Sequence, residues 1–248
     1  MVRPGNFRMK RMALMAGVIG GVALLLAACG GGSGSDQVSN ITTSTPTPPS
    51  AKCPVPGEIP EVLRQWAEMC DEWDPVRIDP QLLGAFNTGV LTRQDVEAIA
   101  RTLKDLEIAK RLAMLTLDLS WLEKMDVVTD ARMKVVRERI WPLLVERDRE
   151  IQPVVVGRYS PTIVSLLLSA QGLVVVVERC PTDVSAIDVN ITTGDKITQR
   201  KHTQVANVTL IKANDGSYRV DDEREVPNRS GASGTEVTCA YSTAVPIP

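Results

Sequence analysis

The chain has 248 residues, of which 44% are hydrophobic, 23% charged and only 4% aromatic. This length allows one sizeable core with tails or two small units, and the core must be built mainly from Leu, Val and Ile. The formal charge is −2, and setting apart the first 28 residues, with four basic side chains and no acidic one, leaves 24 basic against 30 acidic residues. A mildly acidic chain has no electrostatic attraction for nucleic acid, so nucleic-acid binding is excluded.

Residues 1–28 have the pattern of an export signal. A basic stretch, residues 3–11, precedes an apolar run, residues 12–26, that is shorter than a comfortable membrane-spanning helix. The sequence Leu26-Ala27-Ala28-Cys29 resembles a bacterial lipobox, in which the thiol is acylated and the chain is cut just before the cysteine. The alternative is an ordinary secretory signal with a chance cysteine. We expect a lipoprotein signal peptide over 1–28 and lipid attachment at Cys29.

Lipidation implies that the mature chain is attached to a membrane. A bacterial lipoprotein carries at least a two-chain diacylglyceryl unit with palmitate-like chains, which anchors stably. We therefore expect a lipid anchor that holds the protein on the extracytoplasmic face of the cell membrane. Residues 29–52 are rich in Gly, Ser, Thr and Pro. Such a segment cannot bury enough apolar surface to fold, so it predicts a disordered tether.

The four remaining cysteines are an even set in an exported chain, which predicts two disulfides. Three pairings exist for Cys53, Cys70, Cys180 and Cys239, and the most economical joins Cys53 to Cys70 and Cys180 to Cys239. A metal site is the competing interpretation, but the chain has no CxxC motif and a single histidine. We expect no metal, and no thiol nucleophile.

Residues 53–150 predict helices. A first helix starts at Pro60 and carries an apolar stripe as far as Trp73, within a lead-in segment over 53–92. Thr92-Arg93-Gln94-Asp95 resembles a capping box, followed by one long helix or two joined end to end up to Leu122. Another helix begins near Thr129, and Pro142 should kink or end it.

From residue 152 onward, short β-rich runs alternate with turns. The runs cover residues 153–159, 162–169, 173–180, 184–192, 205–213, 217–222 and 236–242. Ala170-Gln171-Gly172 and Asn214-Asp215-Gly216 are hairpin signals, and a further turn is expected over 192–196. Helices followed by strands predict an α+β fold, with N-terminal helices packed on a curved, mostly antiparallel C-terminal sheet.

The order of these parts resembles the nuclear-transport-factor-2-like fold, also called SnoaL-like or cone-shaped, over residues 93–248. The runs 174–197 and 208–226, with a late cysteine, are similar to a group of uncharacterised actinobacterial lipoproteins, and the likeness covers roughly residues 105–241. The matching positions are Cys180, Asp183, Thr193, Gly194, Gly216, Tyr218, Val220 and Cys239. The chain departs from the group at Tyr218, where Trp is commoner, and in its cysteine-bearing segment 53–92. The resemblance implies a fold and a cellular location, and it implies no activity.

Few side chains in the sequence indicate chemistry. His202, the single histidine, lies among basic residues between predicted strands, and we interpret it as part of a solvated turn rather than a general acid or base. The acidic run 221–225 lacks the spacing of a calcium loop and is expected to be a solvated strand end. Asp183 and Asp188 fit turn or capping roles. With no nucleophile, phosphate-loop or zinc motif, we predict no catalytic residue and no cofactor.

Three functions remain open at this point. The first is a non-catalytic interaction module of the cell envelope, tethered to the membrane by its lipid and contacting a protein partner. The second is a carrier of a small apolar ligand or lipid in the cavity between helices and sheet. The third is an enzyme, which His202 facing a cavity beside a carboxylate would support. We expect the first, with the carrier as the alternative.

Overall fold

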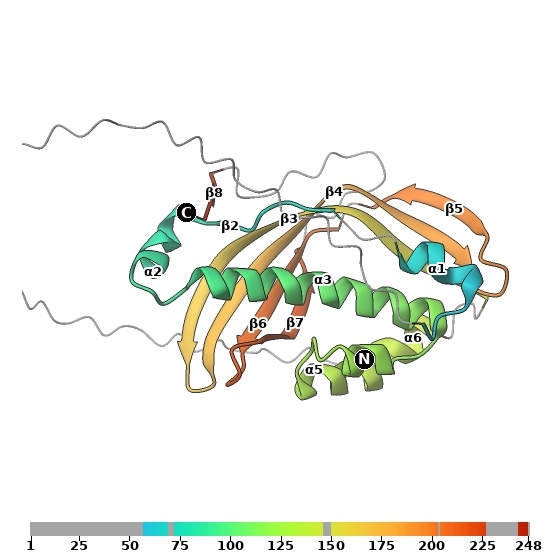
Figure 1. Ribbon diagram of the computed structural model, residues 1–248, viewed down its shortest axis with the longest axis horizontal. Helices are drawn as coiled ribbons and strands as arrows, with labels where there is room; N and C mark the ends of the chain where they lie inside the picture. The colour runs from blue at the N-terminus through green and yellow to red at the C-terminus, as the bar shows by residue number, and fades with distance from the viewer. Residues whose placement is uncertain (1–56, 69–71, 146–149, 203, 227–242, 248) are drawn as a thin grey trace, which may run out of the picture. The chain divides into compact units, whose positions relative to one another are not determined.

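The computed structural model describes residues 57–68, 72–145, 150–202, 204–226 and 243–247, which belong to one compact unit. This unit combines helices with a curved, open, mostly antiparallel sheet, and the helices precede the long strands in the chain (Figure 1). The predicted α+β class is confirmed to that extent. The finer assignment to the nuclear-transport-factor-2-like fold stays a prediction.

The helical elements are α1 (Glu61–Ala67), η1 (Pro80–Leu82), α2 (Leu83–Asn87), α3 (Arg93–Thr116), α4 (Ser120–Lys124), α5 (Asp130–Val135), the π-helical η2 (Val136–Ile140) and α6 (Trp141–Val145). The strands are β1 (Glu72–Trp73), β2 (Arg77–Ile78), β3 (Ile151–Ser169), β4 (Gly172–Asn190), β5 (Lys196–Lys201), β6 (Ala206–Lys212), β7 (Tyr218–Glu225) and β8 (Val245–Pro246).

A long hairpin of β3 and β4 forms the centre of the sheet, whose order is β7-β6-β4-β3-β2-β8. Two strands share the other edge of β4: β6 pairs with Val174–Arg179, and β5 pairs with Ser185–Val189. The short strands β1 and β2 run parallel to β3 on its far edge. The two hairpin turns predicted at residues 170–172 and 214–216 are confirmed by this pairing.

β4 continues through residues 180–184, where the sequence predicted a turn between two separate strands. That prediction is wrong because the irregularity is a β-bulge: Gly157 of β3 lies opposite both Asp183 and Val184. Pro181, which cannot donate a backbone hydrogen bond, falls where β6 has ended and β5 has not begun. A β-bulge bends the strand that carries it, here β4, and so adds to the curvature of the sheet.

The predicted capping box at the start of α3 is confirmed. The backbone N–H of Asp95 donates to Thr92 Oγ1 at 3.2 Å, and the backbone N–H of Thr92 donates to Asp95 Oδ2 at 2.8 Å. α3 then crosses one face of the sheet in front of β3, β4, β6 and β7 (Figure 1). Buried Asp95 holds the helix to two strands: Tyr218 Oη of β7 donates to Asp95 Oδ1 at 3.0 Å, and Lys212 Nζ of β6 lies 2.6 Å from the same oxygen.

Replacing Tyr218 by Phe is expected to lower the free energy of unfolding by about 1.5–3 kcal/mol. The change leaves packing nearly intact but removes a donor from Asp95, which is only 3% exposed. Chemical denaturation of Tyr218→Phe, Asp95→Asn and the double variant measures the coupling, which should be about 1 kcal/mol or more. Additive effects of the two substitutions would contradict the contact.

The lead-in segment differs from the sequence prediction. α1 ends at Ala67, and Trp73 lies in strand β1 beside Tyr159 of β3, with ring centroids 4.8 Å apart. Trp73 therefore belongs to the sheet and not to the first helix. Trp66 of α1 donates its indole N–H to the carbonyl of Gly194 at 2.8 Å, which fastens α1 to the turn between β4 and β5.

The long helical run predicted up to Leu122 is divided into two helices in the structure. α3 ends with Leu117 in a left-handed conformation at φ 53°, and the short α4 follows, so two helices are joined end to end. Further on, η2 is a π-helical turn that ends at Ile140, two residues before Pro142 in α6. A π-turn accommodates the hydrogen bond that proline cannot donate, so Pro142 interrupts the α-helix as predicted, without ending the helical run.

Several predictions fall on residues outside the described ranges: the signal peptide, the tether 29–52, Cys29, Cys53, Cys70, Cys239 and the strand expected over 236–242. Cys180 is described, fully buried and disulfide-bonded. Its pairing with Cys239, and that of Cys53 with Cys70, stay predictions. None of the helices in the described part of the chain combines the length and apolar character needed to span a membrane.

Candidate functional site: two pockets beside a charge network

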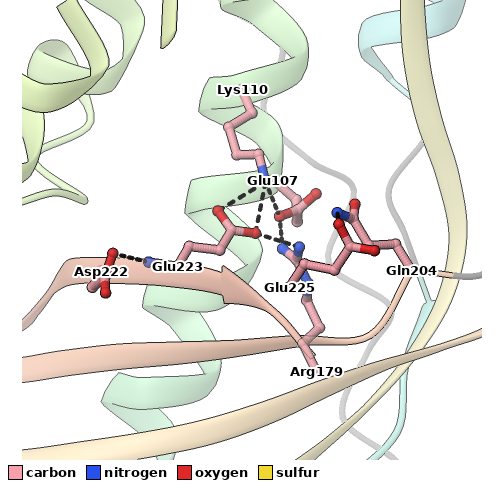
Figure 2. A network of polar contacts seen from close by, with 7 residues as sticks. All are labelled: Glu107, Lys110, Arg179, Gln204, Asp222, Glu223 and Glu225. Carbon is pink, nitrogen blue, oxygen red and sulfur yellow. Dashed lines mark hydrogen bonds and ion pairs between the residues drawn. The ribbon is translucent and has the colours of Figure 1, made fainter. Parts of the chain in front are cut away.

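Four charged side chains meet between α3 and the sheet, and we call them the charge network: Glu107, Lys110, Arg179 and Glu223. Glu107 and Lys110 project from α3, Arg179 from β4 and Glu223 from β7 (Figure 2). Arg179 contacts both carboxylates. Lys110 Nζ lies 3.1 Å from Glu107 Oε1 and 3.2 Å from Glu223 Oε1. The network therefore balances two cations against two anions.

Each member reaches the network through the geometry of its own element. Glu107 lies one turn after Leu103 on the face of α3 that packs against the sheet. Arg179 continues the alternation of Val175 and Val177, whose side chains face α3. Both positions could have been found from the sequence, because a charged residue within an apolar stripe is a signal.

Glu223 reaches the network through a second irregularity. The pairing of β6 with β7 shifts between Thr209 and Leu210, which leaves Asp221 as an extra residue in β7. The extra residue changes the parity of the strand, so Glu223 follows Val220 onto the face toward α3. Thr129 Oγ1 donates to Asp221 Oδ1 at 2.7 Å and fixes the bulge. No local sequence pattern predicts such a shift.

The network keeps its carboxylates ionised. Burial would raise the pKa of Glu223, but the charges of Lys110 and Arg179 outweigh it and lower the pKa to about 2. The pKa of Glu107 is likewise lowered, against burial, by Arg179 and Lys110. The same pairs raise the pKa of Arg179 in spite of its burial. The two carboxylates and the guanidinium of Arg179 therefore stay charged at neutral pH.

On one side of Lys110 and Met114 lies an apolar pocket of about 150 Å³, between α3, the α5–η2–α6 run and β7. We call it the apolar pocket. Its walls are almost entirely aliphatic apart from Trp141, and its polar members are Lys110, Arg132 and Glu223 at one side. The apolar lining residues are Leu106, Ala113, Met114, Leu119, Leu122, Val128, Val136, Ile140, Trp141, Leu144 and Val220.

On the other side of the same two residues lies a pocket of about 200 Å³ with mixed walls, which we call the polar pocket. Its lining includes Glu107, Arg179 and His202. The prediction of a solvated turn around His202 is wrong: β5 occupies residues 196–201, and His202 is half-buried, with its backbone N–H donating to the carbonyl of Val184 at 2.8 Å.

His202 is held in its neutral form. Burial lowers its pKa, and the positive charge of Arg179 lowers it further, although Glu107 opposes this. Neutral imidazole offers one hydrogen-bond donor and one acceptor. His202 thus gives the polar pocket an uncharged group that can both donate and accept. It lines the same pocket as Glu107, the arrangement named above as support for an enzyme, but the carboxylate of Glu107 contacts Arg179 and Lys110.

The other acidic residues singled out in the sequence lie apart from the pockets or are engaged elsewhere. Asp183 is exposed at the bulge, with φ 54°. Asp188 pairs with Arg200 across β4 and β5. The interpretation of residues 221–225 as a solvated strand end is wrong for its middle, since Glu223 belongs to the charge network and Asp222 lies 3.3 Å from Arg132.

Among the described residues, no group of three or more His, Cys, Asp or Glu side chains is arranged to hold a metal ion. In comparisons with known proteins, no family model, no curated protein and no solved structure matches this chain. The two pockets and the charge network are therefore the basis on which a function is argued.

Proposed function

We propose that this protein is a membrane-anchored, extracytoplasmic lipoprotein with a nuclear-transport-factor-2-like domain, and that it binds a small apolar ligand without transforming it. The observation that carries the binding role is the apolar pocket. Its lining is aliphatic over nearly the whole surface and continues the main apolar core, to which Leu106, Leu122, Val128 and Val220 belong. Close packing is the rule in protein interiors, so a preformed apolar space favours a ligand.

The size of the pocket limits the ligand. A space of about 150 Å³ with mainly aliphatic walls has room for a molecule the size of benzene. Burying such a molecule is favourable at about 25 cal/mol per Å² of apolar surface. The ligand portion held here is thus a single ring or a short branched or linear hydrocarbon chain.

Filling the apolar pocket should abolish binding. Val136 lines the pocket from η2 and is only half-buried, so Val136→Phe should place a ring in the pocket without damage to the core. The matched control is Val135→Phe, since Val135 is the neighbouring exposed residue and is not part of the lining. Benzene titrated into the full chain should shift the methyl NMR signals of Leu122, Val128 and Val220 in wild type and control.

The Val136→Phe protein should show at least a tenfold weaker response to benzene than the wild type. Equal responses of the two Phe variants would contradict the proposal, because ligand would then bind elsewhere. Failure of benzene to shift any pocket methyl in the wild type would contradict it as well.

The anchor is tested at Cys29. Replacing Cys29 by Ala should prevent incorporation of labelled palmitate in the producing bacterium, because the acylated thiol is missing. Cys180→Ala is the matched control, since it removes a cysteine from the folded domain and should leave labelling intact. Labelling of the Cys29→Ala protein to the wild-type level would contradict the lipobox.

A second proposal is that the domain acts as an interaction module of the envelope and contacts a protein partner. It is favoured by the tip of the β3–β4 hairpin, where Leu167 and Leu168 are 61% and 70% exposed. Crosslinking on intact cells with wild type and with Leu167→Ser, Leu168→Ser tests it. A crosslinked partner that disappears in the double variant is expected, and identical patterns would contradict it.

A further inference from the structure

The two pockets lie side by side around α3. Lys110 and Met114 line both of them, and they are one turn apart on the helix. Leu106 and Ala113 face only the apolar pocket, whereas Glu107 and Arg111 face only the polar pocket. Two side chains therefore form the boundary between the two spaces.

This boundary is made of unbranched, adaptable side chains. Met114 is half-buried, and methionine has three rotatable bonds that let it fill or vacate irregular space. Lys110 is 38% exposed along its side chain, and its ammonium lies between Glu107 and Glu223. A rotation of Met114 would open its part of the boundary without moving any of the four charged side chains of the network.

The charge network decides which head group would suit the polar pocket. Its two carboxylates are already matched by Lys110 and Arg179, so these four groups offer no unmatched partner to an additional buried charge. Arg111, the third cation in the lining, donates to the backbone carbonyl of Val155 at 2.8 Å. Burying such a charge is costly, whereas a hydroxyl or amide needs only a hydrogen-bonding partner. His202 supplies that partner in the wall of the polar pocket.

We infer that the ligand is an uncharged amphipathic molecule whose apolar part fills the apolar pocket and whose hydroxyl or amide head passes Met114 to hydrogen-bond with His202 in the polar pocket. This inference rests on the proposed function, because it extends the same site. The combined space suits a ring or short chain joined to its head group by a few methylene units.

The test compares probes that differ only in the head group. 4-Phenylbutanol, 4-phenylbutyrate and benzene are titrated into the full chain, and binding is followed by methyl NMR. In the wild type, 4-phenylbutanol should bind at least about tenfold more tightly than 4-phenylbutyrate. His202→Phe should weaken 4-phenylbutanol about tenfold, the effect of one lost hydrogen bond, and leave benzene unchanged.

Lys201→Phe is the matched control, since Lys201 is the exposed neighbour of His202 and lines neither pocket. It should leave the affinity for 4-phenylbutanol unchanged. The inference is overturned if benzene binds but His202→Phe does not affect 4-phenylbutanol, or if 4-phenylbutyrate binds more tightly than the alcohol. A wild type that binds none of the probes would overturn the proposed function itself.

Discussion

Replacing Arg179 by Met is expected to lower the free energy of unfolding by about 3–5 kcal/mol at neutral pH. The substitution removes the cation that contacts both Glu107 and Glu223, and it leaves the buried carboxylate of Glu107 and the half-buried one of Glu223 with Lys110 as their contact in the network. Met has a similar length and no charge, so the loss is electrostatic rather than a loss of volume. Urea denaturation at pH 7 measures it.

Arg200→Met is the matched control for this substitution. Arg200 also pairs with an aspartate, Asp188, but its side chain is 58% exposed. Exposed pairs contribute about 0–1 kcal/mol, so the control should cost no more than that. Equal losses for Arg179→Met and Arg200→Met would contradict the central place of the charge network.

The loss of unfolding free energy caused by Arg179→Met should become smaller as the pH falls. The pKa of Glu223 is depressed from 4.5 to about 2 in the folded protein, and that of Glu107 is lowered too. A depressed pKa contributes stability above the unfolded value, and this stability is lost as pH falls through the folded value. Without Arg179 both carboxyls should protonate more readily, so the difference from wild type should shrink between pH 5 and pH 2.

Replacing Gly157 by Ala is the second large effect that we expect, about 3 kcal/mol or more. Gly157 has φ 140°, and an added Cβ would lie 2.7 Å from both the carbonyl oxygen of Asp183 and the Cα of Val184. Both obstacles are backbone atoms of the bulge in β4, so no side-chain rotation relieves the clash. The whole β3–β4 hairpin would have to shift.

Gly216→Ala provides the comparison for Gly157→Ala. Gly216 also has a positive φ, 84°, but its added Cβ would meet nothing within 4 Å. Only the conformational cost of about 1–2 kcal/mol remains there. Thermal unfolding should therefore separate the two variants clearly, and equal melting temperatures would contradict the bulge geometry.

The features that the sequence predicted correctly are mainly local ones. A capping box such as Thr92–Asp95 is a contact between residues three apart, and the Asn214–Gly216 turn is defined by its own backbone preferences. The prediction for Trp73 failed because its spacing continued the helical stripe, whereas its pairing partner, Tyr159, lies far along the chain. Contacts at such separation leave no local pattern.

The candidate site was only partly accessible to sequence reasoning. Glu107 and Arg179 occupy positions that the helical and strand periods place inside, so their charges could have been recognised as unusual. Glu223 could not, because its inward orientation depends on the extra residue at Asp221. His202 was misjudged because its basic neighbours suggested exposure, whereas β5 carries those neighbours outward and leaves His202 at the polar pocket.

The central claim is that the apolar pocket holds a ligand. It is tested most directly by native mass spectrometry of the full-length protein, extracted in mild detergent and incubated with excess 4-phenylbutanol. The account predicts a bound mass that disappears on denaturation, is absent from Val136→Phe and is present in Val135→Phe. A wild-type protein without bound mass, or a Val136→Phe protein that retains it, would contradict the account.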